Sequence, residues 1–305
     1  MPNQIKSMFP SDLEQPALHH LLLSAVAPRP ICFASTIDVK GNVNLSPFSF
    51  FNVFSSNPPI MIFSPAKGRN GHKNTLDNVK EIGEVVINIV NYPIVEQMSL
   101  SSTAYPKGVN EFIKSGLTQI KSDLIRPPRV GESPVALECT VEKIIELGDD
   151  TGAGNLVIAK VVKIHVQEKY LNESGQLDTK ALDLVARMGG NWYSRVTGDS
   201  LFEIPKPLRA IGMGIDALPI YIRESTLLSG NNLARLGALD NLPSASDIKG
   251  VKDNPQVQVL LSNSKLSSID LTKKLFKLAK SWIERQNANE ALCLLMLIHF
   301  EYKSN

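Results

Sequence analysis

Segments in which apolar residues alternate with polar ones, or run on as β-branched stretches, dominate the first two thirds of the chain and predict β-strands. A turn at 38–41 joins the first two, because Gly41 can adopt the positive φ that a tight hairpin needs. A glycine-rich turn at 148–154 joins the two longest as an antiparallel hairpin. The predicted strands are 31–37, 42–46, 60–64, 84–91, 134–147 and 155–170. Many strands joined by turns favour a mainly β fold, a closed or half-closed barrel.

Apolar residues spaced three to four apart predict helices at fewer places. The clearest lies at 73–83, where either Asn74 or Thr75 can act as N-cap and Gly83 can end the helix. A helix stripe also begins at Asp270, a plausible N-cap, and we expect its apolar face to be a docking surface. Further helices are expected at 18–26 (or an extended segment there), 94–102, after the cap Asn110, 179–187 and 289–302.

Prolines and shifts in composition divide the chain into three parts. We expect an N-terminal arm at 1–17, a barrel domain at 18–205, and a C-terminal extension at 206–305 that is irregular first and helical later. Lys and Arg number 32 against 30 Asp and Glu, a balance that favours neither nucleic acid nor a membrane surface as partner.

Cysteine usage and the ends of the chain bear on its location. Cys32, Cys139 and Cys293 lie far apart within apolar segments, which favours buried reduced thiols in a cytosol-like compartment. The N-terminus lacks the apolar core of a secretory signal, and the longest apolar run, 291–298, is too short to cross a bilayer. A cytoplasmic protein is therefore expected.

Two motifs are set aside. Residues 212–217 fit the pattern G-x-G-x-x-A, but no strand is predicted before them and Pro219 blocks the helix that should follow. His19 and His20 have no further Cys or His nearby to complete a set of metal ligands, so no metal site is expected.

The junction between the loop at 68–72 and the helix at 73–83 has the chemistry of a phosphate site. A helix N-terminus offers free backbone N–H groups and a positive dipole end. Arg69 and Lys73 add positive charge, and Thr75 adds a hydroxyl next to Asn74. The alternative is an ordinary capped surface helix that carries two solvated cations.

The residues that carry a family resemblance run in a fixed order. Residues 28–59 read PRP…ST-x-D…G-x-x-N-L-S-P-F-S-x-F-N…S-x-x-P-P, followed by KNT at 73–75, GVNEF at 108–112 and GGNWYSR at 189–195. This set, which spans about two thirds of the chain, resembles the flavin reductase-like proteins with an FMN-binding split β-barrel. The resemblance implies a split barrel with short helices, bound FMN, and NADH or NADPH as electron donor.

Further expectations follow from the resemblance. Hydride would pass from the nicotinamide through FMN to a second acceptor: a flavin, oxygen or a metal complex. A non-catalytic FMN carrier is the alternative, and a third hypothesis makes the C-terminal part a recruiter of partner proteins. Members of the family are typically homodimers, so a homodimer is expected. The residues expected to hold the cofactor are Arg29, Ser35, Thr36, Asn44, Ser46, Phe48, Ser49, Asn52, Arg69, Lys73, Asn74 and Thr75.

Within this set the roles differ. The strand edge interrupted by Pro47 leaves main-chain groups free for the flavin ring, with Phe48 and Phe50 as walls. The alternative places Phe48, Phe50 and Phe51 in the barrel core. His165 and Asn110 are the candidates for chemistry beyond the flavin. Tyr105 and Glu111 are expected near the nicotinamide or acceptor pocket, and Tyr193 and Arg195 at its rim. The alternative for His165 is a core or rim histidine whose hydrogen bonds are satisfied within the protein. The alternative for Tyr193 and Arg195 is packing and a salt bridge.

Overall fold

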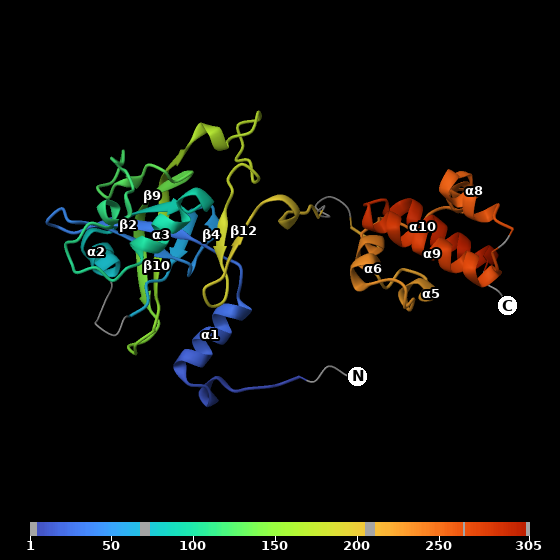
Figure 1. The fold of residues 1–305 in the computed structure, drawn as a ribbon, viewed down its shortest axis with the longest axis horizontal. Helices are drawn as coiled ribbons and strands as arrows, with labels where there is room; N and C mark the ends of the chain where they lie inside the picture. The colour runs from blue at the N-terminus through green and yellow to red at the C-terminus, as the bar shows by residue number, and fades with distance from the viewer. Residues whose placement is uncertain (1–4, 68–73, 205–210, 265, 303–305) are drawn as a thin grey trace. The chain divides into compact units, whose positions relative to one another are not determined.

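The computed structural model describes residues 5–67, 74–204, 211–264 and 266–302. It divides the chain into two compact units, Met1–Phe202 and Glu203–Asn305 (Figure 1). The first unit holds the strands and the second is built from helices, each around a hydrophobic core of its own.

A seven-stranded antiparallel sheet forms the first unit. Its order is β3-β2-β6-β9-β10-β5-β4, so β3 and β4, joined by only two residues, are its two edge strands. The strands are β2 (Cys32–Ile37), β3 (Val43–Phe48), β4 (Phe51–Ser56), β5 (Pro59–Phe63), β6 (Glu84–Ile89), β9 (Val135–Glu146) and β10 (Asn155–Val166). The predicted hairpins are confirmed: Gly41 has φ +88° in the first, and β9 pairs with β10 in the second.

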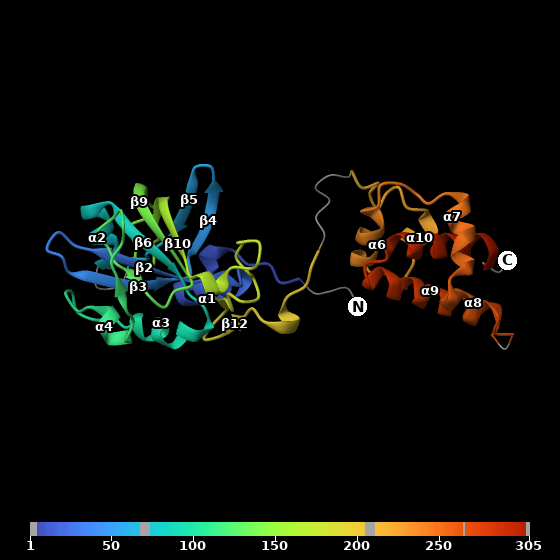
Figure 2. The ribbon, with the colours of Figure 1, turned by 90° about the horizontal axis from the view of Figure 1, so that it is seen from above.

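The two faces of the sheet carry separate cores. Helix α2 (Asn74–Ile82) packs Leu76 and Val79 against the face that contains Cys32 and Ala34 of β2. Helices α3 (Val95–Ser101) and α4 (Glu111–Ser115) cover the opposite face through Met98 and Phe112. Figure 2 shows the helices on their two sides of β2 and β3. Successive strand residues point to opposite faces, so β3 directs Asn44 toward α2 and Leu45 toward α4.

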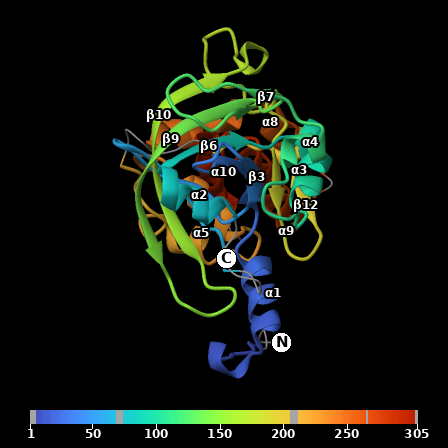
Figure 3. The same cartoon turned by 90° about the vertical axis from the view of Figure 1, so that its left-hand side faces the viewer.

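Two smaller sheets and one helix complete the unit. β1 (Arg29–Pro30), β11 (Val185–Arg187) and β12 (Tyr193–Arg195) form one, and β7 (Gln119–Ile120) pairs with β8 (Arg129–Val130). Helix α1 (Gln15–Ala25) buries none of its residues and projects from the sheet (Figures 1 and 3). It begins within the segment expected to be an arm.

The helix predicted at 179–187 is wrong. The Asp178 carboxylate accepts hydrogen bonds from the N–H groups of Lys180 and Ala181, which makes a turn, and Asp183 adopts a positive φ of 48°. The last three residues then pair as strand β11 with both β1 and β12. Strand pairing supplies backbone partners that a single helical turn does not, so tertiary context overrides the local apolar spacing.

The second unit is helical well before residue 270, contrary to the expected irregular stretch. Its helices are α5 (Ile220–Arg223), α6 (Gly230–Gly237), α7 (Ala245–Gly250), α8 (Pro255–Leu261), α9 (Ser268–Glu284) and α10 (Ala288–Leu297). Ser267, and not Asp270, caps α9, because its hydroxyl accepts the N–H of Asp270. Leu275 and Trp282 of α9 lie in the core of this unit, so the stripe expected to be a docking surface is an internal face.

The set-aside glycine motif has a packing explanation. A Cβ at Gly212 would lie 2.8 Å from the carbonyl oxygen of Gly237, and one at Gly237 would lie 2.8 Å from the backbone of Gly214. Two backbones therefore approach too closely for side chains, and α5 starts only at Ile220. All three cysteines are buried and free, as expected. Among the described helices, none combines the length and apolarity that a bilayer crossing needs.

Candidate functional site

Four buried polar side chains meet where edge strand β3 lies against the N-terminal turn of α2. Asn44 donates from Nδ2 to the Thr75 hydroxyl over 2.9 Å and lies 3.5 Å from the Thr36 hydroxyl. Asn78, one turn into α2, donates to Thr36 Oγ1 over 3.1 Å. The sequence predicted three of these residues; Asn78 was missed, although its place four residues after Asn74 puts it on the same helix face.

The direction of these hydrogen bonds matters. An amide nitrogen can only donate, so both threonine oxygens act as acceptors within the cluster. Each hydroxyl proton remains to be donated, and neither finds an acceptor among the described residues. Buried donors nearly always have partners, so the cluster has the character of a site that receives an acceptor from beyond the described residues.

A small hollow adjoins this cluster at the start of α2. Asn44, Asn74 and Asn78 line it together with Asp38, Asn42, Val43, Lys107, Gly108 and Val109. The nine-residue helix directs its positive end there, and Lys107 adds a full charge that sequence analysis did not single out. Hydrogen bonds from the Asn42 side chain and backbone lower the pKa of Asp38, with smaller help from Lys107. Arg69 and Lys73, predicted to bind phosphate, lie outside the described residues.

The remaining predicted residues of β3 and β4 lie farther along the edge. Ser46 is half-buried on the same face as Asn44, while Phe48 is buried with its ring centroid 5.2 Å from that of Phe63. Phe48 and Phe51 both belong to the barrel core, whereas Phe50 is exposed. Ser49 is half-buried at the bend between the strands. Asn52 is exposed, and its side chain accepts the N–H of Val53.

Arg29 and Ser35 are buried but do not join the threonine–asparagine cluster. The Arg29 guanidinium donates to the carbonyl oxygens of Leu23, Val26 and Met188, which ties the end of α1 to the loop between β11 and β12. Ser35 lies opposite Leu45, on the face covered by α3 and α4, and its buried hydroxyl has no partner among the described residues.

Asn110 and Glu111 have defined local roles at the start of α4. The Asn110 side chain caps the helix by accepting the N–H of Phe112, as predicted for a cap. The buried Glu111 carboxylate accepts the N–H of Leu45 over 2.9 Å, so it covers the open edge of β3. Burial raises the pKa of Glu111, against a smaller opposing effect of that hydrogen bond. Tyr105 lies half-buried beneath the Lys114 ammonium group.

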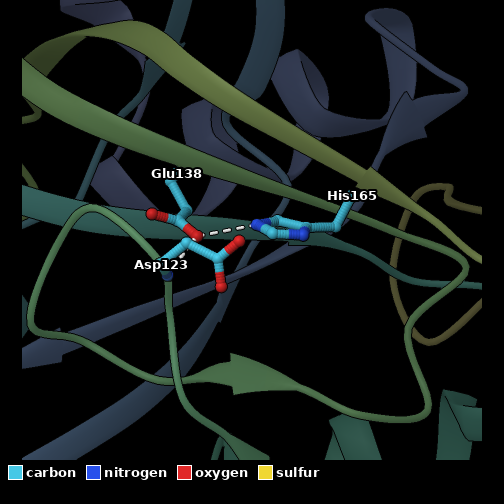
Figure 4. A group of neighbouring side chains, drawn as sticks. All are labelled: Asp123, Glu138 and His165. Atoms are coloured by element: carbon cyan, nitrogen blue, oxygen red, sulfur yellow. Dashed lines mark hydrogen bonds and ion pairs between the residues drawn. The ribbon is translucent and has the colours of Figure 1, made fainter.

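His165 belongs to a second polar cluster, on the outward face of β9 and β10 (Figure 4). Its Nε2 atom lies 2.7 Å from Oε1 of Glu138, a fully buried carboxylate that also accepts the N–H groups of Asp123 and Leu124. Asp123 pairs with Lys163. Asp123, Glu138 and His165 have the chemistry of metal ligands and lie within 4.8 Å of one another. Three donors occupy the oxygens of Glu138, however, and an ammonium group neutralises Asp123, so we assign this cluster a structural role.

Arg195 and Tyr193, expected at the rim, are engaged in packing and ion pairing. Arg195 makes two hydrogen bonds of 2.7 Å to the Asp183 carboxylate and lies 3.5 Å from the centroid of the Tyr92 ring. Tyr193 stacks beneath the Arg187 guanidinium. The salt bridge that sequence analysis held as the plainer alternative is therefore present.

Known proteins resemble this chain both in sequence and in fold. A sequence profile of the flavin reductase like domain matches residues 24–181, just over half of the chain. The chain belongs to the flavin reductase-like family. An uncharacterized protein of Halalkalibacterium halodurans is 37% identical over 201 residues, which cover 65% of this chain and 95% of that protein.

Solved structures agree with this membership. Nitrilotriacetate monooxygenase component B from Bacillus cereus shares 30% identity at a TM-score of 0.63, over 66% of this chain and 100% of that chain. A protein described as a flavin reductase with a split barrel domain, from Shewanella frigidimarina, shares 28% identity at a TM-score of 0.56, over 64% and 95%. The resemblance drawn from the sequence and the split-barrel fold are thus confirmed. The second, helical unit lies beyond the residues that the family profile matches.

The site of this flavin reductase-like protein fits a flavin mononucleotide at its anionic end. The helix N-terminus and Lys107 border the hollow, and the hydroxyls of Thr36 and Thr75 lie behind Asn44 and Asn78, without an acceptor among the described residues. Asp38 is the one acidic residue that lines the described hollow, and its hydrogen bonds with Asn42 engage both carboxylate oxygens.

Proposed function

We propose that the protein binds FMN and passes hydride from NADH or NADPH through it to a second acceptor. The observation that carries the proposal is the hydrogen bond between Asn44 and Thr75, because it joins the edge strand and the helix tip in one cluster. Family membership supports the oxidoreductase chemistry. When bound, the flavin supplies the redox chemistry itself, so no acid–base side chain is required.

In this proposal the chain's own residues bind and orient the cofactor. Thr36 and Thr75 donate their hydroxyl protons to the phosphate, and the amides of Asn44 and Asn78 hold both oxygens in place. Asn74 and Lys107 line the same hollow. Ser46 and Ser49, farther along the β3 edge, are assigned to the ring, and Lys73 and Arg69 to the phosphate on the strength of the resemblance.

A spectrum of the purified protein tests this. We expect a yellow protein that releases FMN on unfolding and loses its yellow colour when NADH or NADPH reduces it. A colourless protein without affinity for FMN would exclude the proposal. A yellow protein that oxidises neither nucleotide in stopped-flow mixing would instead be an FMN carrier.

We also propose that the barrel unit forms a homodimer. Helix α1 and strand β4 leave large apolar side chains in solvent, with Leu22, Val53 and Phe54 each more than half exposed. Exposed apolar surface of this kind favours a protein interface. Light scattering coupled to gel filtration should give twice the mass of 33.4 kDa, and a monomer at micromolar concentration would contradict the proposal.

A further inference from the structure

Three side chains form one row across the small sheet of β1, β11 and β12. Arg29 lies directly opposite Arg187, and Arg187 lies directly opposite Tyr193. Directly opposite residues project from the same face of a sheet, with Cβ atoms about 5 Å apart. Like charges in such a pair destabilise the strands, so two neighbouring arginines call for a compensating group.

The described residues provide no carboxylate for either arginine. Asp183, in the segment before β11, is held by Arg195 through two hydrogen bonds. Arg29 directs its terminal nitrogens to backbone carbonyl oxygens, and its buried Nε has no acceptor among the described residues. Arg187 is half-buried, and its side chain makes no hydrogen bond to another described residue, although its guanidinium lies against the Tyr193 ring.

Tyr193 gives the exposed end of this row a fixed shape. The Arg187 guanidinium carbon lies 4.5 Å from the centroid of the Tyr193 ring, so one planar face of the guanidinium is covered. Stacking leaves the N–H groups at the edge of the guanidinium plane free, and that edge matches the two oxygens of a carboxylate or phosphate. The electrostatics agree: burial first, and Arg187 second, lower the pKa of Arg29.

We propose that Arg187, with Arg29 beside it, binds the oxyanion of a small-molecule ligand, a phosphate monoester or a carboxylate. Both arginines are already oriented before the ligand arrives, one by carbonyl oxygens and the other by an aromatic ring. Arg187 and Tyr193 lie beyond residues 24–181 that the family profile matches, although Tyr193 belongs to the GGNWYSR motif of the resemblance. Only the source of the anion rests on the proposed function: it is either a phosphate of the pyridine nucleotide or a free anion.

Calorimetric titration of the full chain with inorganic phosphate tests the site. Loss of a hydrogen bond to a charged group costs about 1.5–3 kcal/mol, so Arg187→Gln should weaken phosphate binding about 10- to 100-fold. Arg187→Lys keeps the positive charge but loses the paired N–H groups of the guanidinium. Its phosphate affinity should lie between those of the native protein and Arg187→Gln. Lys169→Gln is the matched control, because Lys169 also stacks on a tyrosine, at 4.9 Å, and should leave the affinity unchanged.

Competition identifies the source of the anion. If NADP⁺ displaces phosphate in the native protein and NAD⁺ does not, the extra phosphate of NADP⁺ is the ligand; if neither does, the site takes a free anion. Absence of phosphate binding, or equal losses in Arg187→Gln and Lys169→Gln at unchanged circular dichroism, would overturn the site. Flavin content and nucleotide oxidation are separate measurements, so failure of the proposed function would not be mistaken for failure of this inference.

Discussion

Two buried polar clusters of the barrel unit make opposite use of similar residues. In the cluster of Asp123, Glu138 and His165, a buried carboxylate accepts from two backbone N–H groups and one imidazole (Figure 4). In the cluster of Thr36, Asn44, Thr75 and Asn78, amides donate to hydroxyls, and no described residue accepts the hydroxyl protons. The first cluster has its partners within the chain, whereas the second lacks acceptors among the residues that the structure describes.

The difference separates a structural cluster from a binding site. Glu138 fixes the segment between β7 and β8 onto the outward face of the sheet, together with Glu84, which accepts the N–H of Arg126. Asn88 holds β8 itself by accepting the N–H of Val130. A residue with all of its partners inside the protein contributes stability. One that lacks an acceptor contributes when a ligand supplies it. Substitutions can therefore test which cluster does which.

Removal of Glu138 should have the largest effect. Glu138→Ala leaves two backbone N–H groups and His165 without their acceptor, and removal of one partner from a buried charged pair costs about 3–5 kcal/mol. Urea unfolding measures the free energy of unfolding. Glu142→Ala, an exposed glutamate on the same strand, is the control and should change it by less than about 0.5 kcal/mol. Equal losses in both variants would contradict the structural assignment.

The same carboxylate should give stability a dependence on acid pH. Burial alone would raise the pKa of Glu138, but the hydrogen bonds from Asp123, Leu124 and His165 outweigh burial and lower it. The unfolded state therefore binds this proton first, and stability falls as pH drops from the ordinary value of 4.5 through the lower folded value. Unfolding measured from pH 7 downward should show a shallower acid loss in Glu138→Gln than in the native protein.

Thr75→Val should affect binding more than folding. The valine removes the hydroxyl proton assigned to the phosphate, so FMN affinity should weaken by about 1.5–3 kcal/mol, the cost of one hydrogen bond to a charged group. Fluorescence titration with FMN measures it, and Thr103→Val, an exposed threonine, serves as control. Lys73→Ala should weaken FMN to a similar degree, on the resemblance alone. Unchanged affinity in Thr75→Val would remove Thr75 from the site.

The smallest effect is expected at the solvent-facing edge of the Glu138 cluster. Lys163 and Asp123 form an ion pair whose side chains are each about two-fifths exposed, at 41% and 45%. Exposed ion pairs contribute little to stability because water screens them. Lys163→Met should leave the urea midpoint nearly unchanged, and a loss as large as that of Glu138→Ala would mean that Asp123 is needed to hold Glu138.

The sequence alone predicts much of the barrel because its information is local. Gly41 and Gly83 have the positive φ values that their positions after a strand and a helix indicated, and Asn110 caps α4. The long hairpin of β9 and β10 follows directly from alternating side chains and an intervening turn. Family membership and the split barrel were likewise within reach, because the ordered motifs lie in these same segments.

Contacts between distant segments could not be read in the same way. Lys107 reaches the hollow at α2 from a loop some thirty residues later, and nothing in its neighbourhood along the chain indicates this. The partner of His165 is Glu138, which only the register of β9 and β10 brings near. Val185 and Arg187 lie in a segment that the sequence predicts to be helical. Pairing of this segment with β1 on one side and β12 on the other makes it a strand instead.

Helix α1 shows how a single cation can substitute for a hydrophobic anchor. None of its side chains is buried. The Arg29 guanidinium holds its last turn by donating hydrogen bonds to the carbonyl oxygens of Leu23 and Val26. Ser24 presses against Gly189, where a Cβ would lie 3.0 Å from the Cβ of the serine. At the other end of the helix, the Gln15 side chain lies close to Gly152, where a Cβ would be 3.0 Å from Gln15 Nε2. Because the helix contributes no buried side chain to the cores of the sheet, substitutions on its exposed surface should leave those cores intact.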